Sequence, residues 1–297
     1  MTQSEEVCRR LAALTPSLEW ELEPITTSAD RFKDRPLADD GGKGLFVKEL
    51  DEAVTAGKVD CAVHSLKDVP SRMREGVAMA CVPRRGDARD LLLSKPGWAL
   101  AELPAATLIG SASPRRKALL LAEFAGRAAP RVALLRGNIE TRLRRVAAGD
   151  FDATFLAAAG LDRLGIGIGE LRAAALEPFD FVPAPGQGAL CVTTRGDDTA
   201  TTALAGRLED GASRRAVEAE RAVARTLGGD CRSPVAAYAS VAHDRLKVVG
   251  LAAAPDGSRM VRLEARGAAA KAERLGEELG RRLVDAGARE IIGSGGE

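Results

Sequence analysis

Short apolar runs and stretches with helical spacing alternate along this chain of 297 residues. A brief continuous apolar run indicates a buried strand, and apolar residues at every third or fourth position indicate a helix. The strands predicted in this way are 18–27, 59–64, 77–83, 108–110, 132–135, 151–157 and 189–194. The helices predicted between them are 46–56, 115–124 and 139–148. This alternation is typical of an α/β fold.

The last part of the chain has a different order of elements. A long predicted helix at 214–227 is followed by three consecutive strands and then by an amphipathic helix at 271–286. Strands joined without an intervening helix pair antiparallel. We therefore expect a small C-terminal α/β domain with a three-stranded antiparallel sheet, formed by residues 235–240, 247–254 and 259–266.

Chain length predicts more than one domain, because 297 residues exceed the usual size of a single domain. The strand at 189–194 follows a Pro- and Gly-rich segment and is expected to return to an earlier sheet. The predicted division has a first domain of residues 1–86 plus 189–207, a second of residues 87–185 and a third of residues 210–297.

Composition narrows the classes of function. With 43 Lys and Arg against 42 Asp and Glu, the chain has no global basic field, which argues against a nucleic-acid partner. Two histidines are too few for most His-based metal sites, and no leader or long apolar run predicts export or a membrane span. Scattered cysteines without CxxC spacing predict reduced thiols, no metal and a cytoplasmic location. They are Cys8, Cys61, Cys81, Cys191 and Cys231.

The segment 111–116 combines two hydroxyls with Pro114 at the predicted start of a helix. Free N–H groups at such a start attract anions, and Arg115 with Arg116 could clamp a carboxylate through paired hydrogen bonds. The alternative is an ordinary capped helix with a solvated basic first turn. Taken alone, the segment leaves both interpretations open.

A second arginine-bearing turn follows the strand at 132–135. Asn138 can cap the following helix, with Arg136 before it and Arg142 one turn into it. The alternative is a surface helix in which Glu140 pairs with Arg144. Two such turns at strand ends favour ligand binding, because α/β sheets bind ligands at that edge.

Two further segments carry candidate chemistry. Lys67 and Asp68 follow a buried strand, where they could form a salt bridge beside a structural His64. A carboxylate facing an arginine-lined cleft would instead stay ionised and could stabilise a developing cation. Cys231, on a glycine-led loop, presents a thiol that can form a stable thioether. The glycines at 41–44 lack the spacing of a phosphate loop and predict a surface loop.

In this order, the motifs resemble those of the porphobilinogen deaminase (hydroxymethylbilane synthase) family over nearly the whole chain. Each motif is weak alone, whereas the ordered set is specific. The segments are GGKGLFVKEL (41–50), HSLKDVP (64–70), RD (89–90), SPRR (113–116), LRGN (135–138), AGLDRLG (159–165), PGQGA (185–189) and GDCRSP (229–234).

The resemblance implies a fold and a reaction. Two periplasmic-binding-protein-like lobes would surround a cleft, and a small third domain would carry the cofactor cysteine. Four porphobilinogen molecules would join head to tail with loss of ammonia, giving hydroxymethylbilane. The primer would be a dipyrromethane held as a thioether on Cys231. No metal or nucleotide is required, and a monomer is expected.

The resemblance also implies roles for single residues. Because each pyrrole carries an acetate and a propionate, the cleft needs cations and hydroxyl donors. Asp68 is the expected catalytic carboxylate, which stabilises positive charge on pyrrole nitrogens and moves protons. The expected cofactor-binding residues are Cys231, Lys67, Ser113, Arg115 and Arg116. The expected substrate-binding residues are Ser65, Arg136, Arg142, Arg163 and Gln187.

Members of this family begin with a strand reading roughly Arg-Ile-Gly-Thr-Arg-x-Ser-x-Leu-Ala, followed by a helix that opens near a glutamine. Gln3 matches that glutamine, so we expect the chain as given to lack the first strand. A form extended upstream should then be more stable or more active, and comparing the two forms tests this expectation.

Two alternatives belong to other classes of protein. One is a two-lobed protein that binds an anionic small molecule without turnover, and the other is an inactive truncated paralogue. A pure binding protein has no need for the Cys231 thiol together with Asp68. The presence of both residues favours the enzyme.

Overall fold

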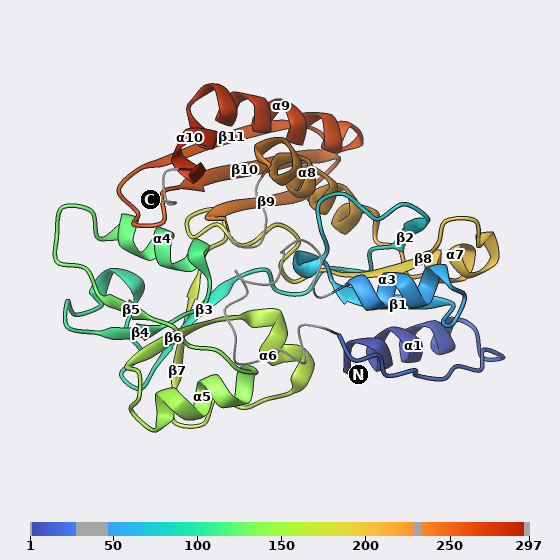
Figure 1. Ribbon diagram of the computed structural model, residues 1–297, viewed down its shortest axis with the longest axis horizontal. Coiled ribbons are helices and arrows are strands. Elements are labelled where there is room, and N and C mark those ends of the chain that lie inside the picture. Colours follow the sequence, from blue (N-terminus) through green and yellow to red (C-terminus); the bar gives the residue numbers. More distant parts are fainter. Residues whose placement is uncertain (1, 28–46, 229–232, 294–297) are drawn as a thin grey trace.

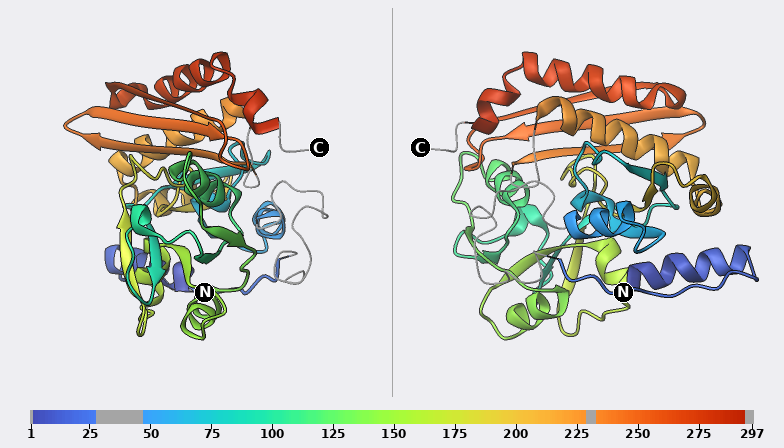
Figure 2. Two further views of the ribbon diagram at one scale, coloured as in Figure 1. Left: turned by 90° about the vertical axis from the view of Figure 1, so that its left-hand side faces the viewer. Right: turned by 45° about the vertical axis from the view of Figure 1, so that its right-hand side comes forward.

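The computed structural model describes residues 2–27, 47–228 and 233–293. Within these ranges the chain forms three sheets, one in each of two lobes and one in a C-terminal domain (Figure 1). The C-terminal domain lies across both lobes, as two further views show (Figure 2). Cys231 and the glycines at 41–44 lie outside the described residues.

The first lobe is built on a sheet of order β1-β8-β2, in which β8 pairs antiparallel with both neighbours. β8 therefore confirms the prediction that this strand returns to an earlier sheet. Val7 and Leu11, four positions apart on one helix face, pack against Leu190 and Val192 of β8. The elements are α1 (Thr2–Leu14), α3 (Lys48–Thr55), β1 (Cys61–Ser65), the 3₁₀ turn η1 (Leu66–Asp68), β2 (Val77–Cys81), β8 (Leu190–Arg195) and α7 (Thr199–Gly206).

The second lobe holds a mixed sheet of order β5-β4-β6-β3-β7. β4 runs parallel to β5 and β6, whereas β3 runs antiparallel to β6 and β7. Its elements are β3 (Asp90–Ser94), η2 (Leu100–Glu102), β4 (Leu108–Gly110), α4 (Pro114–Glu123), β5 (Arg131–Ala133), α5 (Ile139–Ala147), β6 (Ala153–Ala157), α6 (Ala158–Leu164) and β7 (Arg172–Leu176).

The C-terminal domain confirms the predicted three-stranded antiparallel sheet, in the order β11-β10-β9. β10 alternates between two cores, as a strand of period two must when both faces are covered. Leu246 and Val248 face α8 and α9, whereas Val249 and Leu251 pack into the core of the second lobe. The elements are α8 (Gly211–Leu227), β9 (Val235–Ala242), β10 (Arg245–Ala253), β11 (Met260–Ala268), η3 (Ala269–Lys271), α9 (Ala272–Asp285) and α10 (Ala288–Gly293).

Two segments connect the lobes, and they lie side by side. The Gly86 N–H donates to the Gly188 carbonyl at 3.0 Å. Gly188 has φ +82°, and a Cβ there would lie 2.9 Å from the carbonyl oxygens of Gly86 and Asp87. The close approach of the two segments therefore requires glycine at this position.

A buried ion pair joins these connections to the C-terminal domain. Arg85 contacts Glu220 of α8 at 2.5 Å, and Glu220 is fully buried. The two carboxylate oxygens of Glu220 also accept from the Gly186 N–H at 2.7 Å and from the Ala239 N–H at 2.8 Å. The bound carboxylate thus ties the segment between the lobes to both α8 and β9.

The strand predicted at 18–27 is wrong, because this segment forms no regular structure. Leu18 packs on the core of the first lobe, but Trp20 is 44% exposed and Pro24 lacks the N–H that a strand pairing would use. The pattern analysis also missed β3 and β7. β3 begins with a buried aspartate after a polar stretch, and three of the five residues of β7 are alanine, which leaves no apolar contrast.

Candidate active site

Two adjoining pockets lie between the lobes, and the larger one is also lined by the C-terminal domain. The smaller has a volume of about 230 Å³ and the larger about 760 Å³. Lys67 and Arg116 line both of them. The larger pocket extends from Asp68 to Gly228 and Ser233, the described residues on either side of 229–232.

The end of β1 delivers three of the predicted site residues. The strand is followed at once by η1, so Ser65, Lys67 and Asp68 emerge at the edge of the sheet. Ser65 lines the smaller pocket and accepts a hydrogen bond from the side-chain amide of Gln3 at 2.9 Å. Asp68 lines only the larger pocket, where its side chain remains exposed.

The surroundings change the acidity of the pair at η1. The protein around Asp68 raises the pKa of its carboxyl, and the adjacent Lys67 lowers it by a smaller amount. Burial lowers the pKa of Lys67, which Asp68 partly offsets. A carboxyl with a raised pKa in an open pocket can both stabilise a cation and accept a proton.

Both arginine-bearing turns are helix starts, as predicted, and both are capped, although a cap was predicted only at Asn138. The Ser113 side chain accepts a hydrogen bond from the Arg116 N–H, and Pro114 opens α4. The Asn138 side chain accepts one from the Thr141 N–H at the start of α5. Local sequence therefore determines where these helices begin.

Arg115 and Arg116 converge on an internal carboxylate that the sequence analysis did not assign to the site. Each arginine contacts a different oxygen of Asp90 at 2.7 Å, and Asp90 is fully buried. Gln187 also donates to Asp90, at 3.0 Å. Burial opposes ionisation of Asp90, but the two guanidinium groups overcome it and hold the pKa well below its usual range.

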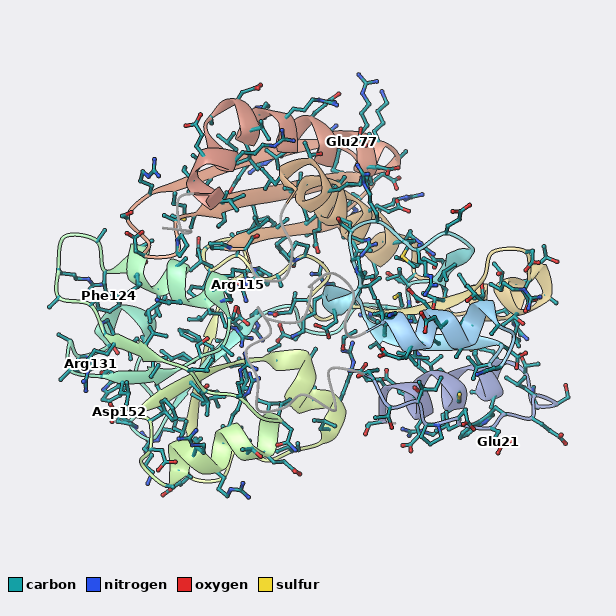
Figure 3. The ribbon with its side chains drawn as sticks, in the orientation of Figure 1. Glu21, Arg115, Phe124, Arg131, Asp152 and Glu277 are labelled. Atoms are coloured by element: carbon teal, nitrogen blue, oxygen red, sulfur yellow. The ribbon has the colours of Figure 1, made fainter. Side chains whose placement is uncertain are left out.

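The contacts within the Asp90 cluster do not use every N–H group of Arg115. Arg115 lies near the centre of the molecule, where α4 begins (Figure 3). Its contacts with Asp90 and the Val182 carbonyl use two of the five N–H groups of a guanidinium. Two positive charges meet one negative charge, so the cluster keeps a surplus positive charge at the pocket wall.

The smaller pocket carries its own cations. Arg142 and Arg163 line it together with Arg116. The pKa of Arg142 is lowered by burial and by the nearby Arg116, and burial also lowers that of Arg163. Arg163 donates to the Gly188 carbonyl at 2.6 Å and lies 3.7 Å from Glu6. Crowded cations of this kind favour the binding of an anion.

The predicted site residues fall into three groups. Asp68, Lys67, Ser113, Arg115, Arg116 and Gln187 line the larger pocket, whereas Ser65, Arg142 and Arg163 line the smaller one. Arg136 is half-buried beside the smaller pocket, whose lining includes Gly137 and Asn138 but not Arg136 itself. Cys231 lies outside the described residues.

Several residues that line the pockets were not predicted from the sequence. Gln3 was recognised only as a marker of the first helix, and it lines the smaller pocket. Arg221 and Arg225 come from α8, far along the chain, so no local motif signalled them. The larger pocket is lined by two carboxylates, Asp51 and Asp68, and by eight cationic side chains, namely Lys48, Lys67, Arg72, Arg74, Arg115, Arg116, Arg221 and Arg225.

This arrangement defines a class of protein. A two-lobed α/β fold with a third domain presents two adjoining pockets lined by cationic side chains, with the exposed carboxylate of Asp68 in the larger one. Residues 1–203 match the family description "Porphobilinogen deaminase, dipyromethane cofactor binding domain", and residues 214–285 match "Porphobilinogen deaminase, C-terminal domain". The chain belongs to the porphobilinogen deaminase family.

Curated relatives agree with this assignment. A porphobilinogen deaminase from Chromobacterium violaceum is 45% identical over 98% of this chain and 93% of its own length. A porphobilinogen deaminase from Syntrophobacter fumaroxidans is 42% identical over 98% of this chain and 93% of its own length. One from Bordetella parapertussis is 44% identical over 98% of this chain and 91% of its own length. In the part of the chain that the structure covers, no helix is long and apolar enough to cross a membrane.

Proposed function

We propose that this chain is a hydroxymethylbilane synthase. It joins four porphobilinogen molecules head to tail with loss of ammonia, on a dipyrromethane primer attached to Cys231. The observation that carries this proposal is the larger pocket, in which Asp68 and both flanks of segment 229–232 share one cation-rich wall. Membership of the porphobilinogen deaminase family supports the same reaction.

The larger pocket fits a dipyrromethane. Each pyrrole ring carries two carboxylates. The eight cationic side chains of the pocket face the lining carboxylates Asp51 and Asp68, and several of them are paired with Asp90, Glu52, Glu273 and Glu277, so a surplus positive charge remains to match a ligand. We assign Lys67, Ser113, Arg115 and Arg116 to this group, which would be attached through Cys231. When bound, it supplies a nucleophilic pyrrole carbon and stays on the protein between rounds.

We assign the smaller pocket to the incoming porphobilinogen. Arg142 and Arg163 would pair with its acetate and propionate, and Ser65 would hydrogen-bond to it. Arg136, next to Gly137 of this pocket, and Gln187, at the back of the larger one, complete the proposed substrate-binding set. Lys67 and Arg116, which line both pockets, would keep the reacting units in register.

Asp68 is the proposed catalytic residue. Loss of ammonia from porphobilinogen leaves an electron-poor azafulvene, and positive charge builds on pyrrole nitrogens as the new bond forms. A carboxylate in the pocket stabilises that charge, and its raised pKa suits it to accept the proton released afterwards. Lys67 beside it favours the ionised carboxylate that the first step needs.

We propose three domains for this reaction, residues 1–86 with 189–207, residues 87–185 and residues 210–297. The division is supported by the three sheets, because the strands of each sheet come from one of these ranges. We further propose that the enzyme acts as a monomer in the cytoplasm, as the resemblance implies.

Intact mass tests the proposal. The purified chain should carry the extra mass of two pyrrole units, and its Cys231→Ser variant should not. The parent should also convert porphobilinogen to hydroxymethylbilane. Unmodified mass and absence of product, both in the chain as given and in the form extended upstream, would contradict the proposed function.

A further inference from the structure

Arg221 of α8 is a buried arginine whose hydrogen bonds all reach into another domain. Its guanidinium donates to the Val69 carbonyl at 3.2 Å and to the Pro70 carbonyl at 2.7 Å. It also lies 3.6 Å from the sulfur of Met73. One side chain from the C-terminal domain thus holds the loop of the first lobe that begins next to Asp68.

The two carbonyls belong to the residues that directly follow Asp68. Since η1 ends at Asp68, no further helical turn follows to hydrogen-bond them. A guanidinium presents N–H groups in a planar fork and can bind two neighbouring oxygens at once. Arg221 therefore fixes the path of the chain as it leaves the catalytic carboxylate.

An apolar contact supports the same attachment. Val217 lies one helical turn before Arg221, on the same face of α8, and is fully buried. It packs in one cluster with Leu66 and Val69, which flank Lys67 and Asp68. Val217 and Arg221, one turn apart on α8, thus contact the residues before and after Asp68.

The other end of α8 leads to the proposed attachment cysteine. The helix ends at Leu227 with Gly228 as its left-handed cap, and Gly228 lines the same pocket as Asp68 and Arg221. One rigid helix therefore contacts the Asp68 loop and begins the segment that contains Cys231. We propose that Arg221 is a positioning residue that fixes the catalytic carboxylate relative to α8, the helix that precedes Cys231 in the chain.

This inference rests on the proposed function, and it predicts a particular kinetic defect. Loss of Arg221 should displace Asp68 without changing the smaller pocket, to which Arg221 does not contribute. A displacement of about 1 Å at a catalytic group can cost about 100-fold in rate. The turnover number should therefore fall while KM for porphobilinogen stays within about threefold.

The experiment compares Arg221→Met and Arg221→Lys with the parent. Methionine keeps much of the length of the side chain but removes its charge and donors, whereas lysine keeps both but loses the fork. Intact mass gives the fraction of chains loaded with the dipyrromethane, and rates are expressed per loaded chain. We expect a loss of about 100-fold for Arg221→Met and a smaller loss for Arg221→Lys, with thermal unfolding recorded for each variant.

Arg215→Met is the matched control, because Arg215 lies on the same helix with a 44% exposed side chain. It should retain parental turnover. Parental turnover and KM in folded, loaded Arg221→Met would overturn the inference, as would the same defect in the control. Failure of loading in Arg221→Met, with normal unfolding and with loading restored in Arg221→Lys, would assign Arg221 to cofactor binding through its charge and would also overturn the inference. Absence of loading and of activity in both the parent and the form extended upstream would instead refute the proposed function.

Discussion

At the scale of single residues, the aspartates Asp90 and Asp68 have different roles because their surroundings differ. Asp90 is fully buried between two guanidinium groups and stays ionised, so it acts as a fixed internal counter-ion. Asp68 is exposed in the larger pocket, and its pKa is raised. The first organises the arginines, and the second is available to a ligand. The surroundings of the two aspartates thus shift their pKa values in opposite directions.

Replacing Asp68 should abolish most turnover and leave the fold intact. Asp68→Asn keeps the size of the side chain and removes its charge, so the rate should fall by about 10²–10⁴-fold. Because the pKa of Asp68 is raised, the parent should lose activity on acidification at a higher pH than an ordinary aspartate would give. Turnover of Asp68→Asn within threefold of the parent would exclude the catalytic role, and the exposed Asp197→Asn serves as control.

His64 should make the stability of the fold depend on pH. It is buried, its Nε2 lies 2.9 Å from the Thr193 hydroxyl, and burial lowers its pKa to about 4. Between pH 6.5 and 4 the unfolded chain binds a proton that the folded chain excludes, so stability falls as the pH falls through this window. The loss should approach about 3 kcal/mol.

Urea unfolding at pH 7 and pH 4.5 measures this term. His64→Gln cannot take up the proton, so its free energy of unfolding should fall less between the two pH values than that of the parent. An identical fall in both proteins would show that other groups carry the acid sensitivity.

Single residues also mark the limit of what the sequence could predict. Asn138 was recognised as a cap, and the start of the helix after Ser113 was predicted, because both signals depend on neighbours along the chain. The partnership of Asp90 with Arg115 spans 25 positions, and that of Arg221 with Pro70 spans 151. Contacts over such separations leave no local pattern, so the sequence analysis could not detect them.

At the scale of elements, the pattern of apolar residues predicted strands correctly where apolar residues stand next to polar ones. The strand at 108–110 has its predicted bounds, because Leu and Ile stand between polar neighbours. In the segment 18–27, apolar and polar residues alternate as in a strand, but the segment is irregular. A strand needs a partner to pair with as well as a suitable sequence pattern. Helix α1 contributes Gln3 to the smaller pocket and Glu6 to an ion pair with Arg163 of the second lobe.

Glu6 of α1 should compete with the substrate for Arg163. The two side chains lie 3.7 Å apart and join the first lobe to the second beside the smaller pocket. A substrate carboxylate that binds Arg163 must replace Glu6, so Glu6→Gln should lower KM for porphobilinogen. The Glu6 side chain remains 33% exposed. If the pair contributes about 1 kcal/mol, the upper end of the range for solvent-accessible ion pairs, KM should fall about fivefold with turnover unchanged.

Initial rates over a range of porphobilinogen concentrations test this prediction. Glu5→Gln, on the same helix, is the control and should behave like the parent. A higher KM in Glu6→Gln would mean that the ion pair closes the pocket rather than competing for it.

At the scale of the whole molecule, the C-terminal domain and the two lobes are joined by contacts of different kinds. The C-terminal sheet shares an apolar core with the second lobe. Its link to the first lobe combines the small cluster around Val217 with polar contacts from Arg221. The two lobes meet at the paired connections, where Gly86 and Gly188 touch. The pockets lie at this junction, so its geometry should control both stability and activity.

Gly188→Ala tests the junction directly. The position has φ +82°, and a methyl group would press on two backbone oxygens at 2.9 Å that cannot rotate away. Gly149 has a similar φ of +85°, but a Cβ there meets nothing within 4 Å. Gly149→Ala should therefore show only the backbone cost of about 1–2 kcal/mol, whereas Gly188→Ala should lose more.

The difference between these two variants isolates the contact between the connections. Urea unfolding gives the two free energies, and turnover gives the functional effect. Gly188→Ala should also reduce turnover, because the Gly188 carbonyl accepts from Arg163 of the smaller pocket. Gly149→Ala, on the surface turn after α5, should retain parental turnover. Equal stabilities and rates in the two variants would mean that the connections can separate without affecting the site, and that the lobes are joined mainly through the C-terminal domain.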